Sequence, residues 1–211
     1  DTLRGFSNIL IINKDILKVD IKKEILESEE LIRSGFRPAK VKIVANLPYY
    51  ITTPIIMRLL EQQVGAESMV FMVQKEVAER MVARPGGKEY GALSVAVQFY
   101  SEARIMFDVP PHCFIPRPEV YSSVIRLKIY KAPPVDVKNR EIFFKTVKAA
   151  FGQRRKTLVN AISNSGYFMA DKEEIKKILG NMGINERQRG ETLTIEQFAE
   201  LSNLLAQFTQ S

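Results

Sequence analysis

The hydrophobic pattern of this 211-residue chain changes once, at Pro133-Pro134, and this change limits how the chain can fold. Before that point, short apolar runs of strand length alternate with segments of helical periodicity, a pattern that favours a parallel, doubly wound α/β sheet. After it, every periodic segment is helical: residues 140–152, 154–164, 171–181 and 194–208. We therefore predict two domains, an α/β domain over residues 1–132 and an all-α domain over residues 133–211.

Apolar runs and helix signals give the expected order of elements in the first domain. Buried strands are predicted for residues 9–12, 41–45 and 69–73, and helices for residues 22–34, 54–63 and 75–82, with Thr53 as the N-cap of the second helix. Residues 83–90 form a loop, and residues 91–100 fit a helix or an extended segment. Strands 103–109 and 122–130 are joined by a proline-rich connector with no room for a helix, so we expect an antiparallel hairpin at the sheet edge.

Charge and composition point to an anionic partner. The formal net charge is +7 and the pI is near 9.4, which favours nucleic acid before membrane. No apolar run approaches the roughly 20 residues of a membrane span, and no signal peptide follows Asp1. The single cysteine, Cys113, excludes an intrachain disulfide and fits a reducing compartment, so we expect a cytoplasmic protein.

The tetrapeptide Asn46-Leu47-Pro48-Tyr49 is the strongest candidate for a binding site. Proline cannot donate to a strand ladder, so Asn46 should lie at the carboxyl end of the strand 41–45, where open α/β sheets bind ligands. An amide, free carbonyls and an aromatic face can together hold a planar base that carries an exocyclic amine. A strand-to-helix turn with a packed tyrosine would use the same residue types.

Five ordered blocks of the sequence resemble the ribosomal RNA adenine dimethyltransferases, most closely those acting on the small-subunit RNA. The blocks are NLPYYI at 46–51, FMVQKEV at 71–77, EYGALSV at 89–95, FIPRPEVYSS at 114–123 and AFGQRRKTL at 150–158. The resemblance implies a Rossmann-like methyltransferase sheet, without its N-terminal strands, followed by a small helical domain. It also implies methyl transfer from S-adenosylmethionine, without a metal, to two adjacent adenines near the 3′ end of 16S rRNA. The implied partner is a partly assembled small ribosomal subunit, and we expect a monomer that does not bind membranes.

The same resemblance assigns roles at the reaction centre. The Asn46 side-chain oxygen and the Leu47 carbonyl would accept from the two hydrogens of the adenine amine, and Pro48 would fix the Leu47 carbonyl. Tyr49 and Phe114 would stack on opposite faces of the base. Asp15, with the Ile16 backbone beside it, would accept from the cofactor's adenine amine, and Asn46 would also contact the cofactor.

A basic cluster gives the expected contact with rRNA. Residues 145–156 contain five cations and no acid, and cations at this density suggest phosphate contacts. The cluster is expected to open a helix, where the helix dipole disfavours cations unless an anion is near. The predicted RNA-binding residues are Arg117, Lys148, Gln153, Arg154, Arg155 and Lys156.

One departure from the family pattern affects the cofactor. Family members begin with a basic arm, a strand, a glycine-rich turn and a second strand that ends in an acid, whereas this sequence contains no G-x-G. We expect either a truncated fragment or a chain whose preceding segment is disordered, and a fragment that binds S-adenosylmethionine poorly and is inactive. Two other functions stay open: a large-subunit rRNA methyltransferase of the macrolide-resistance type, and a non-catalytic RNA-binding or ribosome assembly factor.

Overall fold

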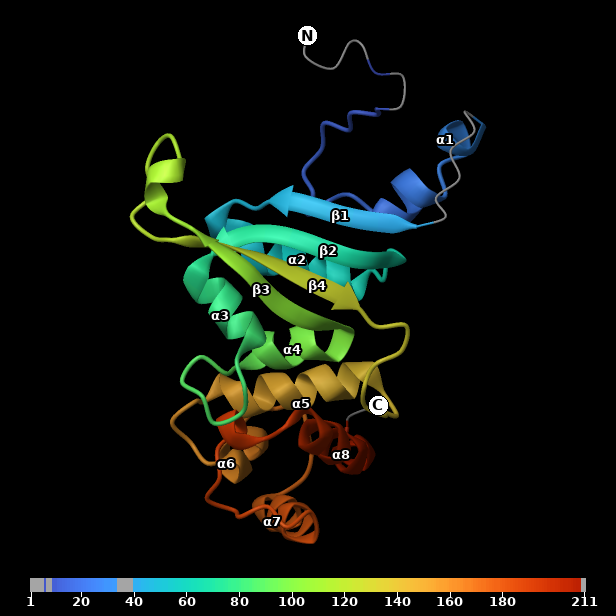
Figure 1. Cartoon of the computed structure of the whole chain (residues 1–211). Helices are drawn as coiled ribbons and strands as arrows, with labels where there is room; N and C mark the ends of the chain where they lie inside the picture. Colours follow the sequence, from blue (N-terminus) through green and yellow to red (C-terminus); the bar gives the residue numbers. More distant parts are fainter. Residues whose placement is uncertain (1–5, 7–8, 34–39, 210–211) are drawn as a thin grey trace.

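A four-stranded sheet forms the centre of the first part of the chain (Figure 1). The computed structural model describes residue 6, residues 9–33 and residues 40–209. The strands are β1 (Val41–Asn46), β2 (Ala66–Gln74), β3 (Ser101–Val109) and β4 (Ser122–Ile129), in the spatial order β1-β2-β4-β3.

Strand directions bring three carboxyl ends to one edge of the sheet. β1 and β2 are parallel, whereas β4 is antiparallel to both β2 and β3. β1, β2 and β3 therefore end at the same edge, and β4 begins there. The predicted antiparallel hairpin of β3 and β4 is confirmed, and β3 is the outermost strand on its side of the sheet.

Three helices, α2 (Thr52–Glu61), α3 (Lys75–Val82) and α4 (Ala92–Tyr100), accompany the sheet. In Figure 1 α2 lies behind the sheet, and α4 lies between the sheet and the C-terminal helices. α3 has its predicted bounds. α4 is apolar on almost every side, and its burial explains why residues 91–100 gave no clear helical period. The predicted cap at Thr53 is wrong, because α2 begins at Thr52, two residues before the predicted start, with Ile51 as its N-cap. The Thr52 hydroxyl donates to the Pro48 carbonyl at 2.9 Å.

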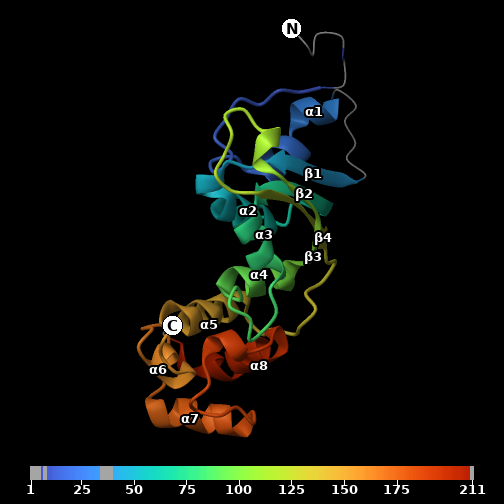
Figure 2. The same ribbon diagram turned by 60° about the vertical axis from the view of Figure 1, so that its left-hand side comes forward.

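The C-terminal part is all-helical, as predicted, and consists of α5 (Arg140–Gly152), α6 (Leu158–Ser163), α7 (Lys172–Asn181) and α8 (Ile195–Leu205). The α5 helix packs beneath α4, with the Phe99 and Phe143 ring centroids 4.7 Å apart (Figure 2). The α/β class with a helical part after it is therefore confirmed, and a domain division at 132/133 stays a prediction. No helix within residues 9–33 and 40–209 is both long and apolar enough to cross a bilayer.

Two predictions near the start of the chain are wrong. Residues 9–12 form no strand, and their side chains, predicted to be buried, are between 37% and 71% exposed. A strand needs a neighbour to pair its backbone groups, and β1 pairs only with β2 among the described strands. The helix predicted over residues 22–34 consists instead of a π-helical turn (Lys22–Leu26) and α1 (Glu29–Arg33), each of five residues. Its predicted end at Gly35 and Pro38 lies outside the described residues.

Candidate active site and RNA interface

An open pocket of about 330 Å³ lies at the carboxyl edge of the sheet. Two segments line it: the tetrapeptide that ends β1 and the connector between β3 and β4. The lining residues are Asn46, Leu47, Pro48, Tyr49, Phe114, Pro116 and Pro118. The structure therefore brings together all five residues predicted to hold the target base, although the connector lies far from the tetrapeptide in the sequence.

The tetrapeptide is held by bonds to β2 and within its own turn. The Leu47 N–H donates to the Met72 carbonyl at 3.1 Å, and the Leu47 side chain is buried. The Pro48 carbonyl accepts from the Ile51 N–H at 3.2 Å and from the Thr52 hydroxyl at 2.9 Å. The turn therefore uses the Pro48 carbonyl, while the Asn46 amide lies exposed at the pocket.

The Tyr49 ring is fixed from the far side of β2. Its hydroxyl lies 2.7 Å from the hydroxyl of Ser122, a buried residue at the start of β4, and the ring is half-buried. A ring tethered at its hydroxyl end loses little further freedom when a base stacks on it. Tyr49 is therefore a preformed wall of the pocket.

Phe114 reaches the pocket from the connector. A 3₁₀ turn over Pro111–Cys113 precedes it, and the Phe114 N–H donates to the Pro111 carbonyl at 3.2 Å. The ring is half-buried and lines the same pocket as Tyr49. In Figure 1 the connector projects beyond the sheet at the edge to which the β1 arrow points.

Hydrogen bonds among Lys75, Asp108 and Ser123 hold the chain where the connector leaves β3. Lys75 Nζ lies 2.6 Å from Asp108, and the Ser123 hydroxyl donates to the other oxygen of Asp108 at 2.7 Å. The hydrogen bond from Lys75, followed by that from Ser123, holds the pKa of Asp108 below its ordinary value. The hydrogen bond to Asp108 in turn raises the pKa of Lys75.

The predicted cofactor residues Asp15 and Ile16 lie outside the residues that line the pocket. Asp15 is exposed, and its Oδ1 accepts from the Leu17 N–H at 3.0 Å. Its second carboxylate oxygen can accept from an amine, so the chemistry of Asp15 fits its predicted role with the cofactor's adenine. Ile16 is partly buried against the core.

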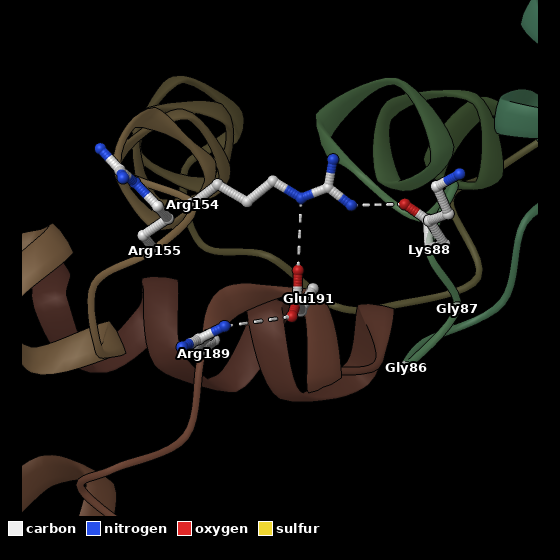
Figure 3. Close-up of a pocket in the computed structure, with 7 residues that line it drawn as sticks. All are labelled: Gly86, Gly87, Lys88, Arg154, Arg155, Arg189 and Glu191. Carbon is white, nitrogen blue, oxygen red and sulfur yellow. Dashed lines mark hydrogen bonds and ion pairs between the residues drawn. The ribbon is translucent and has the colours of Figure 1, made fainter.

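A second pocket, of about 320 Å³, lies between the loop after α3 and the C-terminal helices (Figure 3). Glu191 lies at its centre, with its carboxylate 3.4 Å from Arg154 Nε and 4.0 Å from Arg189 Nη1. The Arg154 guanidinium also donates to the Lys88 carbonyl, and the Gly86 N–H donates to the Glu191 carbonyl at 2.7 Å. The lining residues are Gly86, Gly87, Lys88, Arg154, Arg155, Arg189 and Glu191. Four cations around one acid give this pocket a net positive charge.

The predicted RNA-binding residues fall at three places. Arg154 and Arg155 line the second pocket, and Gln153 and Lys156 are exposed in the same turn. Lys148 lies on α5 with its Nζ 5.7 Å from the centroid of the Tyr167 ring. Arg117 is exposed on the connector, beside the first pocket.

The prediction that the basic cluster opens a helix is wrong. Residues 153–156 form a turn, and α6 begins at Leu158 with Thr157 as its N-cap. The threonine hydroxyl accepts from the Asn160 N–H, which provides the cap that the basic residues cannot. The cluster therefore lies before the helix, where its side chains are exposed.

Sequence reasoning missed Lys88, Arg189 and Glu191. Pro85-Gly86-Gly87 indicated a loop, but nothing local indicated that this loop would meet a turn about a hundred residues later. Tyr90 shows how the two are joined, since its hydroxyl donates to the Leu193 carbonyl at 2.9 Å. Burial, and then the charge of Glu196, raises the pKa of Tyr90, which keeps this donor protonated.

Comparisons with known proteins give one consistent result. The family model described as ribosomal RNA adenine dimethylase matches residues 1–206. The chain is 50% identical over 205 residues to the ribosomal RNA small subunit methyltransferase A of Lachnoclostridium phytofermentans, covering 97% of this chain and 68% of that protein. It is 51% identical to the protein of the same name from Clostridioides difficile, with the same coverage.

Solved structures agree at the level of the fold. A dimethyladenosine transferase from Plasmodium falciparum superposes with a TM-score of 0.73 at 22% identity, covering 95% of this chain and 73% of that chain. The 23S rRNA methyltransferase ErmE superposes with a TM-score of 0.63 at 22% identity, covering 97% of this chain and 75% of that chain. The family match and the relatives at 50% and 51% identity show that the chain belongs to the ribosomal RNA adenine dimethylase family.

Proposed function

We propose that this protein dimethylates N6 of two adjacent adenines near the 3′ end of small-subunit rRNA, with S-adenosylmethionine as the methyl donor. The observation that carries the proposal is the pocket shared by Asn46, Leu47, Pro48, Tyr49 and Phe114 at the carboxyl edge of the sheet. The relatives at 50% and 51% identity, which are named small-subunit methyltransferases, support this choice of substrate.

The pocket offers what an adenine amine needs to become a nucleophile. The N6 lone pair is delocalised into the ring, and hydrogen bonds accepted from both amine hydrogens favour a more tetrahedral nitrogen. The Asn46 side-chain oxygen and the Leu47 carbonyl are the two acceptors. Pro48 limits the backbone at the turn, with φ at −60°, and so helps to orient the Leu47 carbonyl.

Two aromatic walls hold the base. Tyr49 and Phe114 stack on it once it has left its RNA neighbours, and each such contact contributes about 1–3 kcal/mol. Holding the amine in one place removes much of the entropic barrier to transfer. The amine loses its proton after transfer, so the pocket needs no general base.

S-adenosylmethionine would supply an electrophilic methyl group on its sulfonium. Asp15 and the Ile16 backbone would hold its adenine end, and Asn46 would contact it from the side of the target base. The Asp15 carboxylate, exposed and with one oxygen engaged by Leu17, suits this role.

The helical part would hold the rRNA backbone. The four cations of the second pocket favour a phosphate there, with Gln153 and Lys156 in the same turn and Arg117 and Lys148 as further contacts. In this proposal residues 1–132 carry the chemistry, residues 133–211 recognise the RNA, and the protein acts as a monomer on the small ribosomal subunit.

Asn46→Ala, introduced into the organism's own gene, tests the proposal. Because it removes one acceptor from the amine, we expect dimethylation of the small-subunit RNA to fall at least about 100-fold, by analogy with the loss of one preorganised hydrogen-bond partner. Dimethylation blocks base pairing, so primer extension on extracted rRNA measures it. Binding of the purified variant to small-subunit particles should change less than about threefold, since Asn46 holds one base among many contacts.

Val44→Ala is the matched control, because Val44 lies on the same strand and is 77% exposed. It should leave dimethylation unchanged. Unchanged dimethylation in Asn46→Ala would contradict the assigned role. Primer extension on the large-subunit RNA tests the alternative activity of the macrolide-resistance type, which would give a stop there. If the unmodified organism gives a stop on neither RNA, a non-catalytic factor is favoured.

A further inference from the structure

The connector between β3 and β4 carries both side chains that line the first pocket and side chains that do not. Phe114, Pro116 and Pro118 line the pocket, while Ile115 and Arg117 alternate with them and are exposed. Residues 114–116 form bends rather than a strand. Next to the pocket, the connector therefore presents one aliphatic and one cationic side chain that are exposed and do not line it.

Ile115 is the most exposed of the large apolar side chains described, at 102% of its reference area. Pro116 follows it and fixes the local backbone, and a β-branched side chain has few rotamers. Tyr50 follows Tyr49, which lines the pocket from the tetrapeptide, and is 85% exposed. Single exposed apolar residues are common, but here two of them adjoin residues that line the same pocket.

We propose that Ile115 packs against the nucleobase next to the adenine that enters the pocket, and that it fills the space this adenine leaves. Arg117, two residues further along the connector and also exposed, contacts the adjoining phosphate. This inference rests on the proposed function and deepens it, because it assigns Ile115 a part in extracting the base.

The physical reason is the cost of unstacking. An adenine that leaves its stack exposes the faces of its neighbours, and the gap closes again unless something occupies it. Nucleic-acid-binding proteins commonly insert an apolar side chain such as isoleucine between bases for this purpose. A rigid, solvent-exposed isoleucine beside the pocket has the chemistry for this role, and it contributes little to the folded core.

The test uses small-subunit particles in which 2-aminopurine replaces one of the two adjacent adenines. Its fluorescence rises when the neighbouring adenine leaves the stack, so the signal reports extraction without methyl transfer. We expect Ile115→Ala to lower the extraction equilibrium about tenfold, because it removes three carbons from a partly buried contact. Ile115→Leu should restore most of the signal.

Met169→Ala is the matched control, because Met169 is also exposed, at 69%, but lies in the helical part. It should leave the fluorescence unchanged, and all three variants should keep the unfolding temperature of the unmodified protein. A fluorescence rise in Ile115→Ala equal to that of the unmodified protein would overturn the role of Ile115 alone. No rise with the unmodified protein would overturn this inference, whereas primer extension judges the proposed function separately.

Discussion

Asp108, the penultimate residue of β3, has partners from two other elements, Lys75 at the start of α3 and Ser123 in β4. Tyr49 likewise depends on Ser122, 73 positions away. At the scale of single residues, the site is therefore held by side chains whose partners lie far away in the sequence. Local sequence can show that Tyr49 and Asp108 are polar or aromatic at a strand end, but it cannot show which groups they contact.

The Asp108–Lys75 pair predicts a pH dependence of stability. The pKa of Asp108 lies below its ordinary value of 3.8. The contribution of the ionised Asp108 to the stability of the fold is therefore present above pH 3.8 and is lost as the pH falls through the lowered pKa. The pKa of Lys75 lies above its ordinary value of 10.5. The contribution of protonated Lys75 to the stability of the fold is therefore present below pH 10.5 and is lost as the pH rises through the raised pKa. Asp108→Asn should lower the unfolding temperature by about 1–3 °C between these limits.

Thermal unfolding followed by circular dichroism across this pH range measures the effect. The difference between Asp108→Asn and the unmodified protein should close at both ends of the range. Asp136→Asn, at another exposed aspartate, is the control and should show a smaller difference. A difference that stays constant into strong acid would contradict the assigned pair.

At the scale of elements, close packing between the 3₁₀ turn Gly190–Thr192 and α5 sets the position of Glu191. A Cβ on Gly190 would lie 2.8 Å from the Ala150 carbonyl oxygen and 2.9 Å from the Ala150 Cβ. Backbone atoms cannot give way as a flexible side chain can, so only glycine fits here without a shift.

Gly190→Ala should therefore lower the free energy of unfolding by about 1–3 kcal/mol, the usual cost of overpacking. Gly180→Ala is the matched control, because Gly180 lies in α7 and an added Cβ would meet nothing within 4 Å. It should raise the free energy of unfolding by about 0.5–1 kcal/mol, since alanine favours the helix. Urea unfolding measures both variants, and equal effects would contradict the close contact at Gly190.

At the scale of the whole molecule, the second pocket joins two parts of the chain. Arg154 comes from the turn after α5, Lys88 from the loop after α3, and Glu191 from the turn before α8 (Figure 3). These cations and the exposed Arg117 on the connector are the residues that we propose bind rRNA, in keeping with the net charge of +7.

Arg154→Ala/Arg155→Ala should weaken binding to small-subunit particles and reduce its salt dependence. If each arginine neutralises one phosphate, the slope of log affinity against log salt should become shallower by about 1.4–1.8. Lys172→Ala/Lys177→Ala removes the same charge from exposed positions on α7 and is the matched control. Equal changes of slope in the two double variants would indicate a general charge effect rather than a phosphate site.

The sequence alone predicted the α/β class, the β3–β4 hairpin, the bounds of α3 and α5, and residues of the first pocket. These depend on local periodicity, on proline, and on ordered motif blocks, all of which can be read along the chain. Residues 9–12 show the limit, because an apolar run becomes a strand only when a neighbouring strand pairs with it. The tertiary structure alone decided that the Pro85–Lys88 loop meets Arg154 and Glu191, and that Ile115 faces outward. Such contacts depend on how distant elements pack, which no local pattern specifies.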